Sequence, residues 1–238
     1  MPSGGAPVTG TASAWSDTGS GSPRSIENAY LAVYSGGLGV SNRDACSTSG
    51  CSGDYREGTS PEHSMDNDER YDAILFDFGT SIALTSIKLG WTSNDSDISL
   101  LAYTSTAHAY SAPSGLTFAR LDDDDGAGKG WELVGNYADL NTTERAVNAS
   151  GKESRYWLVT AYNSTFAYGG CTDFTGSTSS NGCTNGGSSG SYDYVKIATL
   201  GGTHTTTPPP PPPGVPEPGS LALLGIAGLG LLATRRRS

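Results

Sequence analysis

Short apolar stretches with a period of two residues dominate the middle of this chain and limit the folds open to it. Alternation with that period places every second side chain on one face of a strand. Seven such stretches, separated by clusters of Gly, Ser, Asn and Asp, are residues 30–34, 71–78, 82–91, 98–103, 131–137, 156–162 and 192–197, and residues 116–121 form a weaker candidate. Seven or eight short strands with turn-rich connections predict a mainly β protein, an antiparallel β-sandwich of jelly-roll type.

Composition excludes other classes. Of 238 residues 33 are glycine, and Ser and Thr are also abundant; since these are poor helix formers, a helical bundle is disfavoured. The formal net charge is −10. A nucleic-acid binder needs clustered Lys and Arg to neutralise phosphates, so we expect no nucleic-acid partner.

A proline run separates this β-rich part from the C-terminal segment. Residues 208–213 are six consecutive prolines, preceded by a threonine-rich approach. Such a run favours an extended polyproline rod, about 19 Å long at ~3.1 Å per residue. We interpret residues 201–214 as a Thr/Pro-rich linker.

An apolar segment follows the linker. Residues 221–233 carry no charge, and Arg235, Arg236 and Arg237 follow them. As a helix of ~1.5 Å per residue this segment covers about 20 Å, which is less than the ~30 Å hydrocarbon core. Snorkelling arginines and local thinning let a short segment cross a bilayer, with the arginines on the cytoplasmic side. We therefore expect a short transmembrane helix, in preference to a buried helix. The residues expected to anchor it are Leu221, Leu223, Leu224, Ile226, Leu229, Leu231 and Leu232.

The order of these features resembles a known family. Between the prolines and the apolar segment lie Val215, Pro216, Glu217 and Pro218, and this motif, the short apolar helix and the terminal arginines together resemble the PEP-CTERM sorting signal of Gram-negative bacteria. The resemblance implies that an integral-membrane exosortase recognises the Pro-Glu-Pro element and processes the chain there. It also implies a transient anchor in the inner membrane, with the three arginines as a topological stop, and delivery to the cell surface or the extracellular polymeric matrix.

Residues 34–40, 60–63 and 130–137 are similar, less specifically, to the ectodomains of some PEP-CTERM surface proteins. That resemblance implies no catalytic residues.

The domain organisation follows from these segments. We expect a flexible N-terminal segment at residues 1–26, the β-sandwich at residues 27–200, the linker, and the sorting signal with its helix at residues 215–238. An exported protein begins with a basic and then an apolar segment. Because residues 1–20 contain neither, we expect that a signal peptide is missing from the start of this sequence.

The four cysteines predict disulfide bonds. They are Cys46, Cys51, Cys171 and Cys183, with no CxxC pair and only scattered histidines, so zinc spacing is absent. An even number in an exported chain favours disulfides, and three pairings are open. Local pairing, Cys46 with Cys51 and Cys171 with Cys183, is the simplest, and free thiols are the alternative.

The densest charge, residues 122–125, is a candidate calcium site. Counted from Leu121, the side chains of Asp123, Asp125 and Glu132 fall at positions 3, 5 and 12 of a calcium-loop pattern. Leu121 itself breaks that pattern, because position one requires an Asp. A looser calcium site and a solvated hairpin tip both remain open, and we expect no other cofactor. Smaller acidic clusters at residues 66–68 and 94–97 are predicted to be turns, as are the Asn-x-Ser/Thr sequences that begin at Asn94, Asn141, Asn148 and Asn163.

Two functions remain open at this stage. The first is a non-enzymatic exported protein of the cell surface or extracellular matrix, sorted and processed by an exosortase. The alternative is a carbohydrate-binding module of the extracellular polysaccharide matrix, with or without calcium; it requires exposed aromatic side chains or an acidic metal site on one sheet face. We expect Trp91, Trp131 and Trp157 to lie in the core rather than to form a sugar platform.

Overall fold

The structure is a computed structural model that describes residues 8–43, 63–68, 70–122, 130–174, 182–184 and 192–204. The chain divides into two compact units, Met1–His204 and Thr205–Ser238, and all the described residues belong to the first. The proline run, the sorting motif, the apolar segment and the terminal arginines lie outside the described residues.

The described part is mainly β and mainly antiparallel, which confirms the predicted class. Its one parallel pair among the described strands joins β10 to β7. The strands are β1 Thr11–Ser16, β2 Glu27–Tyr34, β3 Gly37–Ser41, β4 Met65–Asp66, β5 Asp72–Asn94, β6 Ile98–Tyr103, β7 Trp131–Ala138, β8 Arg145–Ala146, β9 Ser154–Ala161, β10 Thr172–Asp173 and β11 Asp193–Thr203. Two short 3-10 helices, η2 Phe118–Arg120 and η3 Ser164–Gly169, lie among them.

Strand β5 unites two stretches that the sequence predicted to be separate strands. Residues 72–78 of the first stretch and all of residues 82–91 lie within its 23 residues. The chain bends between them, where the pairing with β9 shifts register after Asp77. Gly79 has φ +67° at this bend, a left-handed conformation that side chains with a Cβ rarely adopt. Its N–H donates to the Asp77 carboxylate (2.8 Å). The glycine therefore allows one strand to serve two parts of the sheet.

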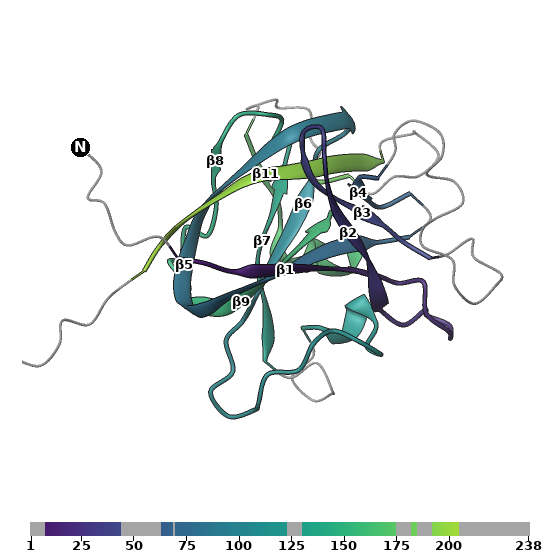
Figure 1. Cartoon of the computed structure of the whole chain (residues 1–238), viewed down its shortest axis with the longest axis vertical. Coiled ribbons are helices and arrows are strands. Elements are labelled where there is room, and N and C mark those ends of the chain that lie inside the picture. Colours follow the sequence, from purple (N-terminus) through teal and green to yellow (C-terminus); the bar gives the residue numbers. More distant parts are fainter. Residues whose placement is uncertain are drawn as a thin grey trace, which may run out of the picture. The chain divides into compact units, whose positions relative to one another are not determined.

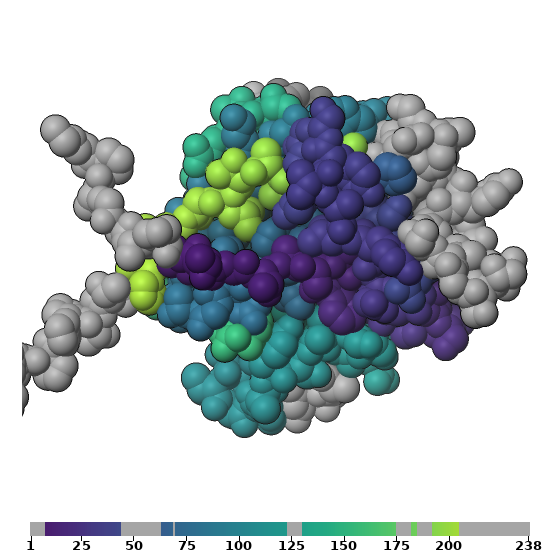
Figure 2. Space-filling model, viewed as in Figure 1, coloured from purple at the N-terminus to yellow at the C-terminus, as the bar shows by residue number. Residues whose placement is uncertain are grey.

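The bent β5 lets the sheet close on itself. Its first half pairs with β1 and β9, and its second half pairs with β11. From β1 the pairing continues through β2 and β3 to β11, which returns to β5. Figure 1 shows β5 turning at the left of the view, with β11 above β1. In the space-filling view of Figure 2, β1 and β11 lie on the same face, and an apolar cleft lined by both strands separates them.

The main core lies between the two halves of the closed sheet. Inward-facing side chains of β5, β6, β9 and β11 meet there, and Trp157 is fully buried among them. The Trp157 indole N–H donates to the Ser154 carbonyl (2.9 Å), so the buried polar group of this ring is satisfied. Trp131 is also buried, as predicted, whereas Trp91 is half-buried beneath the Lys196 ammonium group.

A second apolar cluster covers the outer face of β5, β6 and β9. Leu75, Leu101 and Leu158 point to this side and pack with Phe118 and Phe166. These strands are therefore buried on both faces, which explains why every residue of Ile98–Tyr103 is buried. The weak strand candidate at residues 116–121 was wrong: η2 forms there instead, and its Phe118 side chain helps to cover the sheet.

The folded unit also begins earlier than residue 27, where the sequence placed its start. Strand β1 lies inside the predicted flexible segment and pairs with both β2 and β5. Its Ala14 belongs to the main core. With small and polar neighbours, the sequence Thr-Ala-Ser-Ala-Trp-Ser carries a weak apolar signal, and the pairing on both edges stabilises the strand.

Polar turns form at Asn141 and Asn148, as predicted, whereas Asn94 is the last residue of β5 and Asn163 precedes η3. Asn94, Asn141 and Asn148 have positive φ, a conformation that Asn tolerates better than other residues with a Cβ. The Asn141 and Asn163 side chains accept the N–H two residues on, at 2.8 and 2.9 Å. Because Asn148 and Asn163 are buried, these two side chains serve the turn structure.

Candidate functional site

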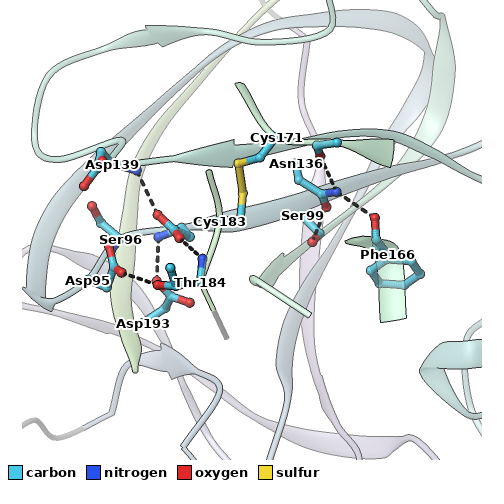
Figure 3. Close-up of a disulfide and its surroundings, with 12 residues drawn as sticks. Asp95, Ser96, Ser99, Asn136, Asp139, Phe166, Cys171, Cys183, Thr184 and Asp193 are labelled. Carbon is cyan, nitrogen blue, oxygen red and sulfur yellow. Dashed lines mark hydrogen bonds between the residues drawn. A yellow bond between two sulfur atoms is a disulfide. The ribbon is translucent and has the colours of Figure 1, made fainter. Parts of the chain in front are cut away.

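Four aspartates from three separate parts of the chain meet at one end of the sheet. Asp95 follows β5, Asp97 precedes β6, Asp139 follows β7, and Asp193 begins β11. The carboxylate oxygens of Asp95, Asp97 and Asp139 lie within 4.8 Å of one another. Figure 3 shows this group beside the disulfide. The strand ends thus concentrate negative charge that the sequence had spread over about a hundred residues.

Backbone N–H groups and one side-chain amide donate hydrogen bonds to the two buried carboxylates of this group, Asp97 and Asp193. Asp97 accepts the N–H of Asp139 (2.9 Å) and that of Thr184 (2.8 Å). Asp193 accepts the Asp97 N–H at 2.7 Å and the Asn67 side-chain amide at 2.6 Å. Hydrogen bonds of this kind stabilise a carboxylate and also fix the loops that donate them.

Burial and mutual repulsion raise the pKa values of these groups. Loss of solvent, followed by the charges of Asp95 and Asp139, raises the pKa of Asp97 to about 7. Burial, and then the charge of Asp97, raises the pKa of Asp193 well above its usual value. At neutral pH the group is therefore poised between charged and neutral forms.

A disulfide attaches a neighbouring loop to this group. Cys171 and Cys183 form the bond, with their Cα atoms 5.7 Å apart, which confirms the second of the two predicted local pairs. Thr184, the next residue, donates its hydroxyl to Asp95 (2.9 Å) as well as its N–H to Asp97. Cys46 and Cys51 lie outside the described residues.

Asp95, Asp97 and Asp139 have the chemistry of a cation site, because Ca²⁺ prefers oxygen ligands such as carboxylates. Sequence reasoning interpreted residues 94–97 as a turn and missed this arrangement. The Asp-x-Asp spacing was visible, but the fold alone brings Asp139 and Asp193 to it. Of the residues predicted to bind calcium, Asp123 and Asp125 lie outside the described residues. Glu132 does not join the group, because its carboxylate contacts the Lys152 ammonium group (2.5 Å) and accepts the Thr104 hydroxyl (3.1 Å).

A groove of about 690 Å³ runs along β7, apart from the aspartate group. Residues 130–135 form one side, and residues 104, 105, 107, 108, 122, 168 and 169 border it on the others. Among its side chains, Tyr168 is 68% exposed, whereas Trp131 is buried and its indole N–H donates to the Ser111 carbonyl (3.4 Å). The volume is in the range of small-molecule sites, about 300–1,000 Å³.

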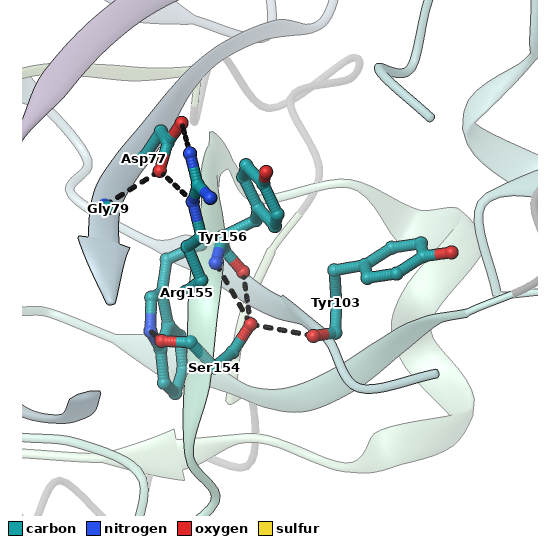
Figure 4. A network of polar contacts seen from close by, with 7 residues as sticks. Asp77, Gly79, Tyr103, Ser154, Arg155 and Tyr156 are labelled. Atoms are coloured by element: carbon teal, nitrogen blue, oxygen red, sulfur yellow. Dashed lines mark hydrogen bonds and ion pairs between the residues drawn. The ribbon is translucent and has the colours of Figure 1, made fainter. Parts of the chain in front are cut away.

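Buried hydrogen bonds position the walls of this groove. The Asn136 amide donates to the carbonyls of Phe166 (2.7 Å) and Gly170 (2.8 Å), which holds η3 beside β7, as Figure 3 shows for Phe166. On the other wall, the Tyr103 hydroxyl donates to the Ala109 carbonyl (2.9 Å). The Tyr103 carbonyl in turn accepts the Ser154 hydroxyl (2.6 Å), in the network drawn in Figure 4.

An aromatic stack extends this network toward the surface. The rings of Tyr110 and Tyr156 stack at 3.5 Å, and the Arg155 guanidinium group lies over the Tyr156 ring. Arg155 also forms two hydrogen bonds with Asp77 (2.6 and 2.9 Å), which Figure 4 shows. The segment of residues 104–110, which borders the groove, is thus held against β9, and Arg155 of β9 is in turn bound to β5.

No described helix is long and apolar enough to cross a membrane. Every predicted residue of the sorting motif, the membrane anchor and the arginine stop lies in the undescribed residues 205–238, so these predictions depend on sequence comparison.

Comparison with known proteins identifies one feature. No curated protein matches the sequence of this chain. Residues 214–237 match the family model of the PEP-CTERM protein-sorting motif, and this range contains Val215, Pro216, Glu217 and Pro218 together with the apolar segment and the arginines. The resemblance inferred from the sequence is thereby confirmed: the chain carries a PEP-CTERM protein-sorting motif.

Proposed function

We propose that this protein is exported, processed by an exosortase at Pro216, Glu217 and Pro218, and left at the cell surface or in the extracellular matrix. The match of residues 214–237 to the PEP-CTERM motif carries this proposal. That motif implies export, membrane-associated sorting and processing by an exosortase. The confirmed disulfide between Cys171 and Cys183 supports an oxidising destination, because disulfides persist outside the cytosol.

The proposed architecture has three parts. A β-sandwich of jelly-roll type is the exported domain, a Thr/Pro-rich linker follows it, and a short helix over residues 221–233 holds the chain in the inner membrane until processing. Two prolines beside a single carboxylate keep the backbone of the motif extended, a shape that a protease-like site can bind as a strand.

Expression of the full gene in hosts with and without an exosortase tests this proposal. We expect intact chain without the enzyme, and with it a mature chain that lacks Arg235, Arg236 and Arg237, as measured by intact mass. Glu217→Ala should remain intact in both hosts, because the motif loses its carboxylate. The matched control, Pro210→Ala in the proline run, should be processed normally. An intact wild-type chain in both hosts, or normal processing of Glu217→Ala, contradicts the proposal.

We also propose that the exported domain is not an enzyme. The Glu132 carboxylate, an acid in the groove, is already paired with Lys152 and Thr104. The Asp97 carboxylate binds two backbone N–H groups in a buried site. Both acids thus have structural partners, which supports a binding role.

The second candidate function is a carbohydrate-binding module of the extracellular polysaccharide matrix. The groove along β7 favours it, because an exposed ring and several polar groups border the same space. Calcium assistance at Asp123, Asp125 and Glu132 stays a prediction. Calorimetric titration of the full chain with Ca²⁺ tests it, and an absence of binding heat at millimolar concentration would remove it.

A further inference from the structure

We propose that the groove along β7 binds a neutral saccharide, with Tyr168 as the stacking surface and Glu132 as an acceptor for sugar hydroxyl groups. The inference rests on the second candidate function, to which it gives a location and a ligand class. It commits to a short stretch of uncharged polysaccharide.

The first observation is the open edge of β7. The Thr104 N–H donates to the Gly130 carbonyl at 2.7 Å, so the main-chain groups of Gly130 face β6. Antiparallel pairing alternates, and the N–H and C=O groups of Trp131 and Leu133 therefore face away from β6. Within the described strands, β10 covers this edge only at Tyr137 and Ala138. Main-chain donors and acceptors are thus presented along the side of the groove that residues 130–135 form.

The second observation is the set of polar side chains around that edge. The Ser105 hydroxyl accepts the N–H groups of Ala107 (3.2 Å) and His108 (3.0 Å), and its own proton therefore remains to donate. The Glu132 carboxylate has about four acceptor positions, of which Lys152 and Thr104 occupy two. A surface that offers both donors and acceptors at close spacing matches sugar hydroxyl groups, since each hydroxyl both donates and accepts.

The third observation is the exposed ring at the groove wall. Tyr168 is 68% exposed although it borders the groove. Its aromatic face offers an apolar surface on which the apolar face of a sugar ring can stack. Gly169 fixes the position of this wall: a Cβ there would lie 2.4 Å from the Leu133 side chain. The short 3-10 helix can therefore lie directly against β7 and carry Tyr168 at its end.

Charge decides between neutral and acidic saccharides. Asp122 and Glu132 both border the groove, and the whole chain carries a formal charge of −10. A uronic acid polymer would bring further carboxylates to this surface and be repelled. A neutral polymer avoids that repulsion and gains charge-assisted hydrogen bonds to Glu132, which are about twice as strong as neutral ones.

Native affinity electrophoresis of the purified full chain in mild detergent tests the inference. The gels contain dextran, galactomannan or alginate. We expect at least one of the two neutral polymers to retard the wild-type chain more than alginate does. Tyr168→Ala should weaken that retardation about tenfold, which equals ~1.4 kcal/mol of stacking. The control Tyr30→Ala, an exposed tyrosine of β2 that does not border the groove, should behave as wild type.

Glu132→Gln tests the charge argument separately. The amide keeps the shape of the side chain, so we expect weaker binding of the neutral polymer and a smaller difference between that polymer and alginate. Unchanged melting temperatures show that each variant is folded. The inference is overturned if no polymer retards the chain, if alginate retards it most, or if Tyr168→Ala binds as well as wild type. Because the assay uses purified chain, its result does not depend on exosortase processing, and failed sorting would be recognised independently by mass.

Discussion

The carboxylate of Asp193 accepts the backbone N–H of Asp97 at 2.7 Å, although 96 residues separate them. This bond joins the first residue of β11 to the residue that precedes β6. It brings the two buried carboxyl groups of Asp97 and Asp193 close together. One of them, Asp97, also binds the loops that carry Asp139 and Thr184. The aspartate group is therefore a structural junction whose strength depends on protonation.

Stability should fall as the pH rises from about 5 to about 8. Burial, and then the charge of Asp95, raises the pKa of Asp97 from its ordinary value of 3.8 to about 7 in the folded chain, so the folded state binds more protons than the unfolded state across this window. By linkage, the stability that protonated Asp97 contributes is fully present below its pKa in the unfolded chain and is lost as the pH rises through its pKa in the folded chain. The loss amounts to about 2–4 kcal/mol of the free energy of unfolding. Urea denaturation at several pH values measures it.

Two variants isolate this effect. Asp97→Asn cannot ionise, so the pH dependence in this window should shrink, although one backbone hydrogen bond is lost. Asp77→Asn is the matched control: hydrogen bonding to Arg155 lowers the pKa of Asp77, and its contribution is lost only in more acidic solution. A free energy of unfolding that increases between about pH 5 and about pH 8 contradicts the prediction.

Removal of the disulfide should destabilise the domain by about 2–3 kcal/mol, because the bond closes a 12-residue separation in the unfolded chain. The double variant Cys171→Ser with Cys183→Ser should show this loss in urea denaturation under oxidising conditions. Dithiothreitol should lower the wild-type melting temperature more than that of the variant. Equal stability of the two oxidised proteins would show that the bond contributes nothing.

Trp157→Ala should lower the free energy of unfolding by about 3–5 kcal/mol. Loss of the fully buried ring leaves a cavity in the main core, and the Ser154 carbonyl loses the indole N–H that it accepts. Val33→Ala serves as the control. Val33 is 80% exposed, and its truncation should change stability by less than about 0.5 kcal/mol. Chemical denaturation of both variants is the measurement, and similar losses would argue against the position of the core.

Gly79→Ala should destabilise the bend of β5 by about 1–2 kcal/mol. Space is not the reason, because a Cβ at Gly79 meets nothing within 4 Å. The cost comes from φ +67°, and Gly79→Asn should therefore be better tolerated than Gly79→Ala. Thermal melts of the pair are compared with wild type. If alanine proves as stable as glycine, the bend does not require a left-handed residue.

Much of the fold could be predicted from the sequence, because local alternation determines which segments become strands. The stretches at residues 98–103 and 131–137 are strands β6 and β7 within one residue of the predicted ends. Prediction failed where a strand depends on its partners. Strand β1 has a weak apolar pattern, and residues 116–121 contain apolar side chains that cover the sheet instead of joining it.

The candidate sites divide in the same way. The sorting motif was predictable because it is defined by the order of neighbouring residues, and residues 214–237 match it. The aspartate group and the groove were not predictable. Asp95, Asp139 and Asp193 lie at the ends of three different strands, and Tyr168 lies more than thirty residues from the β7 edge that it borders.

By itself the sequence determined most of the strand-forming segments and the sorting motif, and it favoured the local disulfide, since each depends on residues close together in the chain. Only the tertiary structure decided that β5 bends at Gly79 and closes the sheet, that both faces of β6 are buried, and that distant aspartates share one site. Pairing and burial free energies act between segments far apart in sequence, and no local pattern specifies which segments will meet.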